Sequence, residues 1–490
     1  MTEPYEIVIG LEVHVQLLTE SKMFCGCSTK FGEPPNTLTC PVCIGMPGSL
    51  PVMNRKAYAL AVKAALALNC QIARFTKWDR KNYYYPDLPK GYQISQYDLP
   101  LSHDGFLQIA DPKGRVEPRR IGIIRVHLEE DAGKSMHDEA AGKADSRIDL
   151  NRAGTPLLEI VSQPDLRSPA EAKAYLTELK LLLNYLGVSD CNMQEGSLRV
   201  DANINLHVAT PEGTVATPIV EVKNMNSFRA VERALAFEAQ RQYDEWLRTR
   251  KRLGEVPKST RGWDETQGIT WPQRSKEEEQ EYRYFPDPDL VPLRIDPGWI
   301  ARVRAETPEL PAQVRARLME EYGLGPNEAD WLTQSPQYAE YFQRAVAAGA
   351  KPAEAAAWMM GDFARLLNAT DTELEQSRVT PEALAELLKL VDEGRISGKM
   401  AKAFFERMFE TGVSAAQLAA EEGGQIADAE SIGRIIDRVI AEQPDVWAAF
   451  VAGDEKKLTY LMGQVMKASR GKANPQETRR LLMERMQKGE

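Results

Sequence analysis

An acidic run near the middle of the chain carries residue types that suit metal and phosphate chemistry. His127-Leu-Glu-Glu-Asp131 follows the strand-like run Ile121–Val126. Because side chains alternate along an extended chain, one face of this strand is expected to hold Arg125, His127, Glu129 and Asp131. Three consecutive acids are costly to bury unless a cation offsets their charge. The run is therefore a candidate site for a hard metal ion with bound phosphates, although a solvated strand end turning at Gly133 would have the same composition.

A second polar strand face lies near the N-terminus. Residues 6–17 alternate almost perfectly between apolar and other side chains, which predicts a half-buried strand. The polar face carries Glu12 and His14 side by side, and a carboxylate and an imidazole in this arrangement could share one metal ion. The alternative is a solvent-facing strand with ordinary polar residues.

Four of the six cysteines form two closely spaced pairs, Cys25-x-Cys27 and Cys40-x-x-Cys43. Four thiolates in two tight pairs suit a tetrahedral structural zinc ion. Such an ion would also hold the intervening loop, since Phe31–Asn36 offers little core of its own. Buried reduced cysteines are the alternative interpretation.

Two basic segments are candidates for nucleic-acid contact. Arg80–Tyr92 interleaves tyrosines with lysines, and three of its side chains could stack on unpaired bases or hold phosphates: Lys81, Tyr83 and Lys90. Packing of these tyrosines into the core is an equally open interpretation. Residues 456–488 are also strongly basic, which fits contact with a phosphate backbone or a charged exposed helix face. The candidates in this tail are Lys456, Lys457, Lys467, Arg470 and Lys472.

The remaining pattern predicts an α+β fold. Strands are expected at 121–126, 156–161, 200–208 and 219–224, and long helices after Ser168 and Ser227, without a regular strand–helix–strand rhythm. This order predicts a largely antiparallel sheet. Residues 254–290 are expected to be a closing loop, and the pattern is helical after about Pro297. We expect a sheet domain with the cysteine loop at 1–295, a helical domain at 296–410 and a helical tail domain at 411–490.

Composition excludes several classes of protein. The 490-residue chain has 43% hydrophobic and 27% charged residues, which is typical of a globular protein with several domains. Its formal charge of −10 argues against a general nucleic-acid coat but permits a local basic patch. With no apolar run of membrane-span length and no secretory signal, a soluble cytoplasmic protein without membrane contact is expected. Gly133-Lys134-Ser135 imitates the end of a P-loop, but Leu128 stands where its first glycine should be.

Several long motifs together resemble the B subunit of the tRNA-dependent amidotransferase, GatB of the GatCAB complex. The resemblance covers nearly the whole chain, and the motifs are Gly10–His14, Lys90–Tyr97, His127–Lys134, Asn151–Glu159, Tyr282–Leu290 and Leu461–Lys467. It implies an ATP-dependent reaction in which the side-chain carboxyl group of Glu-tRNA(Gln) or Asp-tRNA(Asn) is phosphorylated and then attacked by ammonia. In the family, an amidase A subunit supplies the ammonia through a channel, and a small C subunit ties A and B together.

This reaction gives the candidate residues their expected roles. The first domain would be a catalytic cradle and the C-terminal helices a tRNA-binding tail. Phosphoryl transfer needs positioning and charge neutralisation. We expect Mg²⁺ to be held by Glu12, His14 and Glu129 or Glu130, with Glu159 as an additional candidate. The groups expected to face the ATP phosphates are Lys134, Asn151, Arg152 and Lys223.

Two other interpretations remain open. A noncatalytic tRNA-binding scaffold would use the acidic strands only structurally. The related archaeal-type E subunit, specific for Glu-tRNA(Gln), carries a synthetase-like insertion, and residues 219–297 leave no room for one. The sequence does not decide between Glu-tRNA(Gln) and Asp-tRNA(Asn) as the substrate.

Overall fold

The computed structural model describes residues 3–111, 114–137, 146–273, 282–422, 429–454, 456–469 and 471–488. The chain forms two compact units, residues 1–311 and 312–490. The first unit carries the sheets, and every described element of the second is helical. The predicted α+β class, with a largely antiparallel sheet followed by helices, is confirmed.

A ten-stranded sheet organises the first unit, in the order β15-β14-β13-β11-β1-β10-β7-β6-β2 with β12 beside β11. Its four central strands are β11 (Leu198–Thr210), β1 (Tyr5–Gln16), β10 (Pro156–Ser162) and β7 (Arg119–Glu130). The outer strands are β2 (Gln71–Ile72), β6 (Ser102–Ile109), β12 (Gly213–Ala216), β13 (Val220–Lys223), β14 (Ser259–Asp264) and β15 (Ile269–Pro272). The pairs are antiparallel except for β13–β14.

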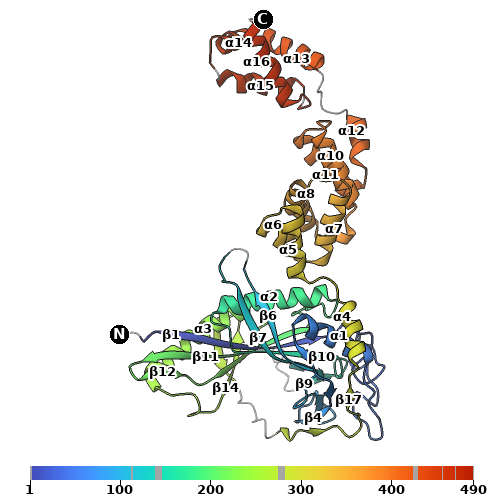
Figure 1. Cartoon of the computed structure of the whole chain (residues 1–490), viewed down its shortest axis with the longest axis vertical. Helices are drawn as coiled ribbons and strands as arrows, with labels where there is room; N and C mark the ends of the chain where they lie inside the picture. Colours follow the sequence, from blue (N-terminus) through green and yellow to red (C-terminus); the bar gives the residue numbers. More distant parts are fainter. Residues whose placement is uncertain are drawn as a thin grey trace. The chain divides into compact units, whose positions relative to one another are not determined.

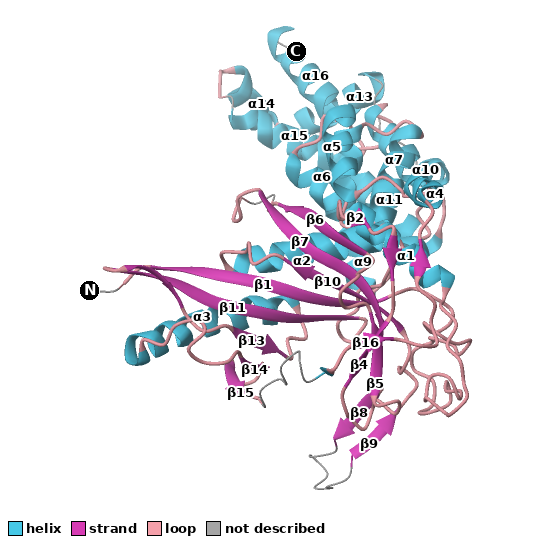
Figure 2. Cartoon of the chain, turned by 60° about the horizontal axis from the view of Figure 1, so that its bottom comes forward, coloured by secondary structure: helices cyan, strands magenta, loops and turns pink. Residues whose placement is uncertain are grey.

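The alternation predicted for residues 6–17 gives the sheet an apolar face and a polar face. Ile9, Leu11, Val13 and Val15 are fully buried in the main core. That core also takes residues from α1 (Arg55–Ala67), α2 (Pro169–Tyr185) and α3 (Phe228–Thr249); Figures 1 and 2 show α2 and α3 along one face of the sheet. Asn54, Ser168 and Ser227 cap these helices by accepting backbone N–H bonds. The other face is therefore left to the polar side chains.

Three small sheets complete the first unit. They are β3 (Phe75–Thr76) with β17 (Leu293–Arg294), β4 (Asp79–Asn82) with β5 (Tyr92–Ser95) and β16 (Phe285–Pro286), and β8 (Lys134–His137) with β9 (Ser146–Asp149). The prediction of a closing loop at 254–290 was wrong, because β14 and β15 extend the large sheet and β16 pairs with β4. β15 pairs with β14 as a short hairpin, whereas β14 and β16 become strands by pairing with β13 and β4, which lie well before them in the chain.

The predicted domain boundaries differ from the observed packing. Helix α4 (Pro297–Ala305) lies beyond the boundary expected at residue 295, yet it packs on α1, and its Val303 belongs to the main core of the first unit. The second unit contains α5 (Pro311–Tyr322), α6 (Pro326–Leu332), α7 (Pro336–Ala347), α8 (Pro352–Trp358), α9 (Ala364–Thr370), α10 (Pro381–Asp392), α11 (Gly398–Thr411) and α12 (Ala415–Glu422). Because α12 packs on α10 and α11, the boundary expected at residue 410 falls within this group.

The last four helices have a hydrophobic cluster of their own. They are α13 (Ala429–Glu442), α14 (Pro444–Val451), α15 (Lys456–Ala468) and α16 (Pro475–Lys488). Ile436, Leu461 and Leu482 are fully buried within this cluster. Across the described residues, none of the helices combines the length and apolar character that a membrane crossing requires.

Candidate functional site

Four ionisable side chains form a row across the polar face of the large sheet. In the strand register, His14 of β1 lies opposite Glu159 of β10 on one side and Arg199 of β11 on the other. Glu159 in turn lies opposite His127 of β7. Because directly opposed residues on antiparallel strands bring their side chains together, the order β11-β1-β10-β7 assembles the row from segments far apart in sequence.

The strands β1, β7 and β10 contribute a cluster of possible metal ligands. His14 Nε2 lies 3.6 Å from Glu129 Oε1 and 3.6 Å from Glu159 Oε2. One ligand atom from each of the three residues lies within 4.8 Å of the others. One imidazole and two carboxylates fit a divalent cation, the carboxylates suiting Mg²⁺ and the imidazole also suiting transition metals. His127 adjoins the cluster, with its Nε2 3.2 Å from Glu159 Oε2.

Burial and mutual charge set the protonation of this cluster. Burial alone would lower the pKa of His14. The hydrogen bond and negative charge of Glu159, together with the smaller effect of the Glu129 charge, raise that pKa to about 9. Burial would raise the pKa of Glu159, yet His127 and His14 hold it well below its usual value. Burial and the neighbouring Glu159 charge raise the pKa of Glu129. His14 is thus an imidazolium held between two carboxylates in a largely buried cluster. The solvated-strand interpretation does not hold for Glu129, which is 4% exposed.

Two acids predicted for the same site lie elsewhere. Glu12 shares the polar face of β1, but its Oε1 accepts a hydrogen bond from Asn203 Nδ2 at 2.9 Å, and it does not join the three-residue cluster. Glu130 points to the opposite side of β7 from Glu129. Its carboxylate pairs with Lys90 and accepts the backbone N–H of Ile94 at 2.9 Å.

A cleft of about 550 Å³ opens beside the row. Its lining includes three of the predicted phosphate-facing residues, Lys134, Asn151 and Arg152, together with Arg199 from the row. Lys223 does not line the cleft. It pairs at 2.5 Å with Asp201, whose side chain belongs to the lining. The lining carries four basic side chains, Lys30, Lys134, Arg152 and Arg199, and four acidic ones, Glu33, Asp149, Glu195 and Asp201, so basic groups able to meet phosphate oxygens lie among acids.

Asp131 anchors the two arginines of the cleft. Its Oδ2 lies 2.8 Å from a terminal nitrogen of Arg199, 3.6 Å from Arg152 Nε and 2.9 Å from Gln16 Nε2, which donates to it. Burial would raise the pKa of Asp131, but Arg199 and Arg152 hold it below its usual value. A buried carboxylate with two arginine partners fixes the direction of both guanidinium groups.

The four paired cysteines converge as predicted. Their sulfur atoms all lie within 4.8 Å of one another, and a tetrahedral zinc ion with bonds of about 2.3 Å would need sulfur–sulfur distances of roughly 3.8 Å. A hydrogen bond from the Cys25 thiol, together with the Lys22 ammonium, lowers the pKa of Cys43 and favours a thiolate there. The donor set fits zinc, so the alternative of merely buried cysteines is disfavoured by the geometry.

The candidates for nucleic-acid contact differ in how far their side chains are exposed to solvent. Lys81 lies over the ring of Tyr282 at 4.9 Å, whereas the Tyr83 hydroxyl donates to Gln93 Oε1 at 3.0 Å and Tyr83 is half-buried. Lys90 pairs with Glu130 and its side chain is 8% exposed, so its ammonium is not displayed at the surface. In the tail, Lys456 and Lys467 are exposed, Lys457 and Lys472 are half-buried, and Arg470 lies outside the described residues.

Sequence reasoning gave no role to Arg199 and did not predict what Asp131 and His127 contact. Each lies on a strand or strand end whose alternation was visible, since Arg199 shares its face with Asp201 and His127 shares its face with Glu129. The missing information was which strands are neighbours.

Comparison with known proteins identifies close similarity over the full length. The family model of the GatB/GatE catalytic domain matches residues 7–301, and that of a GatB domain matches residues 340–486. The B subunit of the aspartyl/glutamyl-tRNA(Asn/Gln) amidotransferase of Moorella thermoacetica is 54% identical over 486 residues, covering 98% of this chain and 100% of the relative. The protein of the same name from Rhodopirellula baltica is 50% identical over 482 residues, covering 98% and 97%.

Proposed function

The chain belongs to the GatB/GatE family, as a B subunit of the tRNA-dependent amidotransferases, and we propose that its cleft activates the side-chain carboxyl group of a mischarged tRNA by phosphorylation. It takes part in the amidation of Glu-tRNA(Gln) or Asp-tRNA(Asn) and is a ligase-type subunit. ATP supplies the phosphoryl group. The single observation that carries the proposal is the His14–Glu129–Glu159 cluster beside a cleft lined by Arg152 and Arg199.

The proposed reaction has two balanced steps. A carboxylate oxygen of the aminoacyl group attacks the γ-phosphorus of ATP, an O–P bond forms, and ADP leaves. Ammonia then attacks the carbonyl carbon of the acyl phosphate, the C–O bond breaks, and inorganic phosphate leaves as the amide forms. The first step supplies the leaving group that a free carboxylate lacks.

The residues of the cleft have distinct roles in this proposal. Arg152 and Arg199 face the charge that develops on the transferred phosphoryl group, and Asp131 keeps both guanidinium groups in place. Lys134 and Asn151 line the same cleft and extend its contact with the phosphates. His14, Glu129 and Glu159 would hold a divalent cation, Mg²⁺ in the cell, which would neutralise phosphate charge.

We assign a structural zinc ion to Cys25, Cys27, Cys40 and Cys43. The convergence of the four sulfur atoms supports this assignment. Such an ion would fix the loop between the cysteine pairs, and that loop borders the cleft at Thr29–Glu33.

The partners follow from the name of the relatives. They are called B subunits, which implies a complex of several different chains, and we assign the ammonia supply to an amidase A subunit and the joining role to a small C subunit. The chain itself shows no Ser or Cys nucleophile in a recognisable motif for glutamine hydrolysis. We propose that the helices α13–α16 bind tRNA through Lys456, Lys457, Lys467 and neighbouring basic residues, and that the complex acts in the cytoplasm, where aminoacyl-tRNA is used.

A noncatalytic scaffold is the competing interpretation. It would have no need to bury His127, Glu129 and Asp131 at this end of the sheet, since buried ionisable groups are costly. The experiment that separates the two is amidation of mischarged tRNA by the assembled complex with added ammonia, which bypasses the A subunit. His14→Ala is expected to abolish ATP cleavage and amidation while tRNA affinity is retained; a scaffold would keep amidation unchanged.

A further inference from the structure

Five tyrosine rings form a continuous row on the first unit, here called the tyrosine row. It draws on the loop after β4, the end of β5 and the segment before β16, and its members in spatial order are Tyr85, Tyr83, Tyr282, Tyr284 and Tyr97. Neighbouring ring centroids lie 5.9, 6.1, 6.1 and 4.0 Å apart in that order. The first three contacts are edge-on, and the last is a parallel stack. These are the distances of interacting aromatic pairs, so the five rings form one surface.

The tyrosine row is open to solvent at both ends. Tyr85 is 61% exposed and Tyr97 is 39% exposed, whereas the three rings between them are half-buried. Lys81 lies over the middle of the row, with its Nζ 4.9 Å from the ring centroid of Tyr282 and 5.9 Å from that of Tyr83. Surfaces that bind unpaired nucleotides have this composition, because rings stack on bases and an ammonium group meets phosphate.

Hydrogen bonds attach the tyrosine row to the end of β7, where Glu129 lies. The Tyr83 hydroxyl donates to Gln93 Oε1 at 3.0 Å, and Gln93 Nε2 donates to the carbonyl oxygen of Glu130 at 2.7 Å. On the same strand β5, Ser95 Oγ lies 3.5 Å from Glu129 Oε2. Strand β5 therefore brings the tyrosine row to the edge of the metal-ligand cluster.

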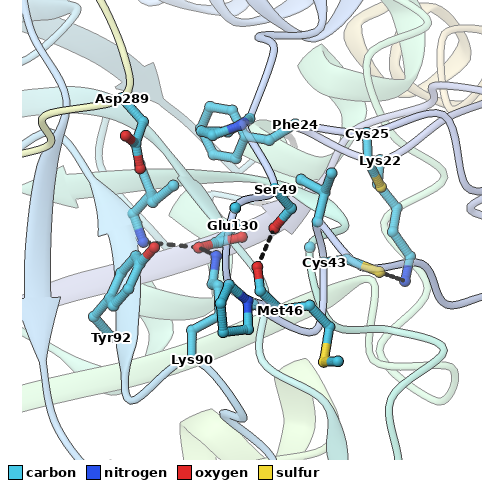
Figure 3. A pocket seen from close by; sticks show the side chains of 17 residues that line it. Lys22, Phe24, Cys25, Cys43, Met46, Ser49, Lys90, Tyr92, Glu130 and Asp289 are labelled. Carbon is cyan, nitrogen blue, oxygen red and sulfur yellow. Dashed lines mark hydrogen bonds and ion pairs between the residues drawn. The ribbon is translucent and has the colours of Figure 1, made fainter.

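The Glu130 side chain holds this junction from β5 as well. Its carboxylate accepts the Ile94 N–H at 2.9 Å and pairs with Lys90. Figure 3 shows Lys90 and Tyr92 close to that carboxylate. With backbone and side chain of one residue both bonded to β5, the tyrosine row has a fixed position relative to the cluster before any ligand binds.

The loop that carries Tyr85 also borders the cleft. The Asp87 carbonyl oxygen accepts the Gly133 N–H at 2.9 Å, and the Gly133 carbonyl oxygen accepts a bond of 2.6 Å from Arg152, which lines the cleft. Within the described residues, the cleft lining includes none of the five tyrosines. The tyrosine row and the cleft are thus two separate surfaces that adjoin each other.

Two substrates have to meet at the metal-ligand cluster. Lys134, Arg152 and Arg199, the groups assigned to the phosphates of ATP, all lie in the cleft. The second substrate carries its aminoacyl group on the last ribose of a tRNA, at the end of an unpaired strand. Because an aspartyl or glutamyl side chain is short, that strand must lie beside the cluster when the carboxyl group reaches it. Unpaired ends of RNA are commonly bound by stacking on aromatic side chains.

We propose that the tyrosine row binds the unpaired 3′-terminal nucleotides of the aminoacyl-tRNA, with bases stacked on the rings and Lys81 against a phosphate group. This assignment rests on the proposed function, which brings the aminoacyl group to the cluster. Stacking is tolerant of base identity, so the same surface would serve tRNA(Gln) and tRNA(Asn).

Photo-cross-linking locates the terminal base without any turnover. One probe is tRNA(Gln) whose 3′-terminal adenine carries an 8-azido group, and the other is 8-azido-ATP. Each is bound to the assembled complex and irradiated, and the labelled peptides are identified by mass spectrometry. The tRNA probe is expected to label the peptides that carry the tyrosine row, and the ATP probe the peptides that line the cleft.

Two cross-linking results would overturn the proposal. If only the ATP probe labels the tyrosine row, the row holds the adenine of ATP. If the tRNA probe binds the complex but labels none of these peptides, the row does not contact the 3′ end, as when a partner subunit covers it.

Steady-state kinetics with free ammonia test the stacking contact by substitution. Tyr85→Leu combined with Tyr282→Leu keeps the apolar bulk and removes two aromatic faces. The KM for Glu-tRNA(Gln) is expected to rise about tenfold, since each stacked base contributes measurably to affinity, while the KM for ATP changes less than about twofold. Tyr85→Phe combined with Tyr282→Phe should retain the wild-type KM, because stacking needs the ring and not the hydroxyl group.

Trp271→Leu is the matched control, at a ring on β15 that is 46% exposed and lies outside the tyrosine row. It should change neither KM. Equal KM values for tRNA in the Leu and Phe variants would contradict the proposal, as would a change in the KM for ATP alone. If the double Leu variant does not fold, Tyr85→Leu decides in its place, because this side chain is largely exposed.

The two proposals fail in different ways. A wild-type complex that performs no ATP-dependent amidation would refute the proposed function, while a cross-link from the terminal base to the tyrosine row would still stand. A complex that amidates normally but whose tRNA probe never labels the row would refute the tyrosine row alone.

Discussion

His14 and Glu159 lie directly opposite each other on the antiparallel strands β1 and β10, with the imidazole Nε2 3.6 Å from the carboxylate Oε2. The pairing follows from the order of strands, since β10 lies far from β1 along the chain and becomes its neighbour only in the folded sheet. Both side chains belong to a face that holds further acids instead of apolar residues. The pair is the centre of the proposed activation site.

Removing one ligand from this centre is expected to stop activation. Glu159→Gln keeps the size of the side chain but removes the charge shared by His14 and His127. ATP cleavage dependent on mischarged tRNA should fall by roughly 100-fold or more, while the circular dichroism spectrum and tRNA affinity stay near wild type. Isothermal titration with Mn²⁺ should show the same loss as a weakened cation site.

Glu12→Gln is the matched comparison on the same strand face. A glutamine oxygen can still accept the hydrogen bond from Asn203, so this variant is expected to retain most of the ATP cleavage. Equal damage from Glu12→Gln and Glu159→Gln would show that Glu12 belongs to the cation site, as the sequence alone indicated.

Asp131→Asn should release the two arginines of the cleft. Removing one partner of a buried ionic group leaves the other charges uncompensated, and a loss of about 3 kcal/mol in the free energy of unfolding is expected. Denaturant unfolding of the full chain measures this loss, and the KM for ATP should rise in the complex. Asp445→Asn, at an exposed site on α14, is the control and should change neither quantity. Wild-type stability and KM in Asp131→Asn would contradict the anchoring role.

Metal analysis tests the four-cysteine site. Purified full chain should contain about one zinc ion per molecule, and Cys40→Ser should lower this content and the temperature of unfolding. Cys70→Ser, at a buried cysteine outside the cluster, should leave the zinc content unchanged. A well-folded wild-type chain without zinc would contradict the assignment.

The basic tail should contribute affinity for tRNA but no chemistry. Because the core of α13–α16 extends from Ile432 to Leu482, substitution is a cleaner test than truncation within it. Replacing Lys456, Lys457 and Lys467 together by Gln is expected to reduce the slope of log affinity against log salt by about 2. Amidation at saturating tRNA should survive. A control with Lys389, Lys399 and Lys402 replaced should keep the wild-type slope, and an unchanged slope in the tail variant would exclude these lysines from tRNA contact.

The polar faces could be predicted from sequence, but their neighbours could not. Alternation along residues 6–17 placed Glu12 and His14 correctly on one face, because side-chain direction on a strand is a local property. Which of the nearby acids meets His14 depends on strand order and register. The register places Glu159 opposite His14, and the pleat turns Glu129 toward them and Glu130 away. The contact between Arg199 and Asp131 was missed for the same reason, since it joins the ends of β11 and β7.

The four-cysteine site, in contrast, could be predicted from the sequence. Its ligands all lie between Cys25 and Cys43, so local spacing was sufficient to predict their convergence. The contact of Lys22 with the Leu150 carbonyl oxygen could not be predicted in the same way, because the two residues are 128 positions apart in the chain.

The fate of the carboxyl oxygen tests the central claim most directly. The complex would be supplied with ATP, free ammonia and Glu-tRNA(Gln) whose side-chain carboxyl group carries ¹⁸O in both positions, and the released phosphate would be analysed by mass spectrometry. If the carboxyl group is phosphorylated, the C–O bond that breaks leaves one ¹⁸O atom in each phosphate, with ADP as the nucleotide product, and Glu159→Gln releases no labelled phosphate. Amide formation accompanied by unlabelled phosphate would contradict activation by phosphoryl transfer.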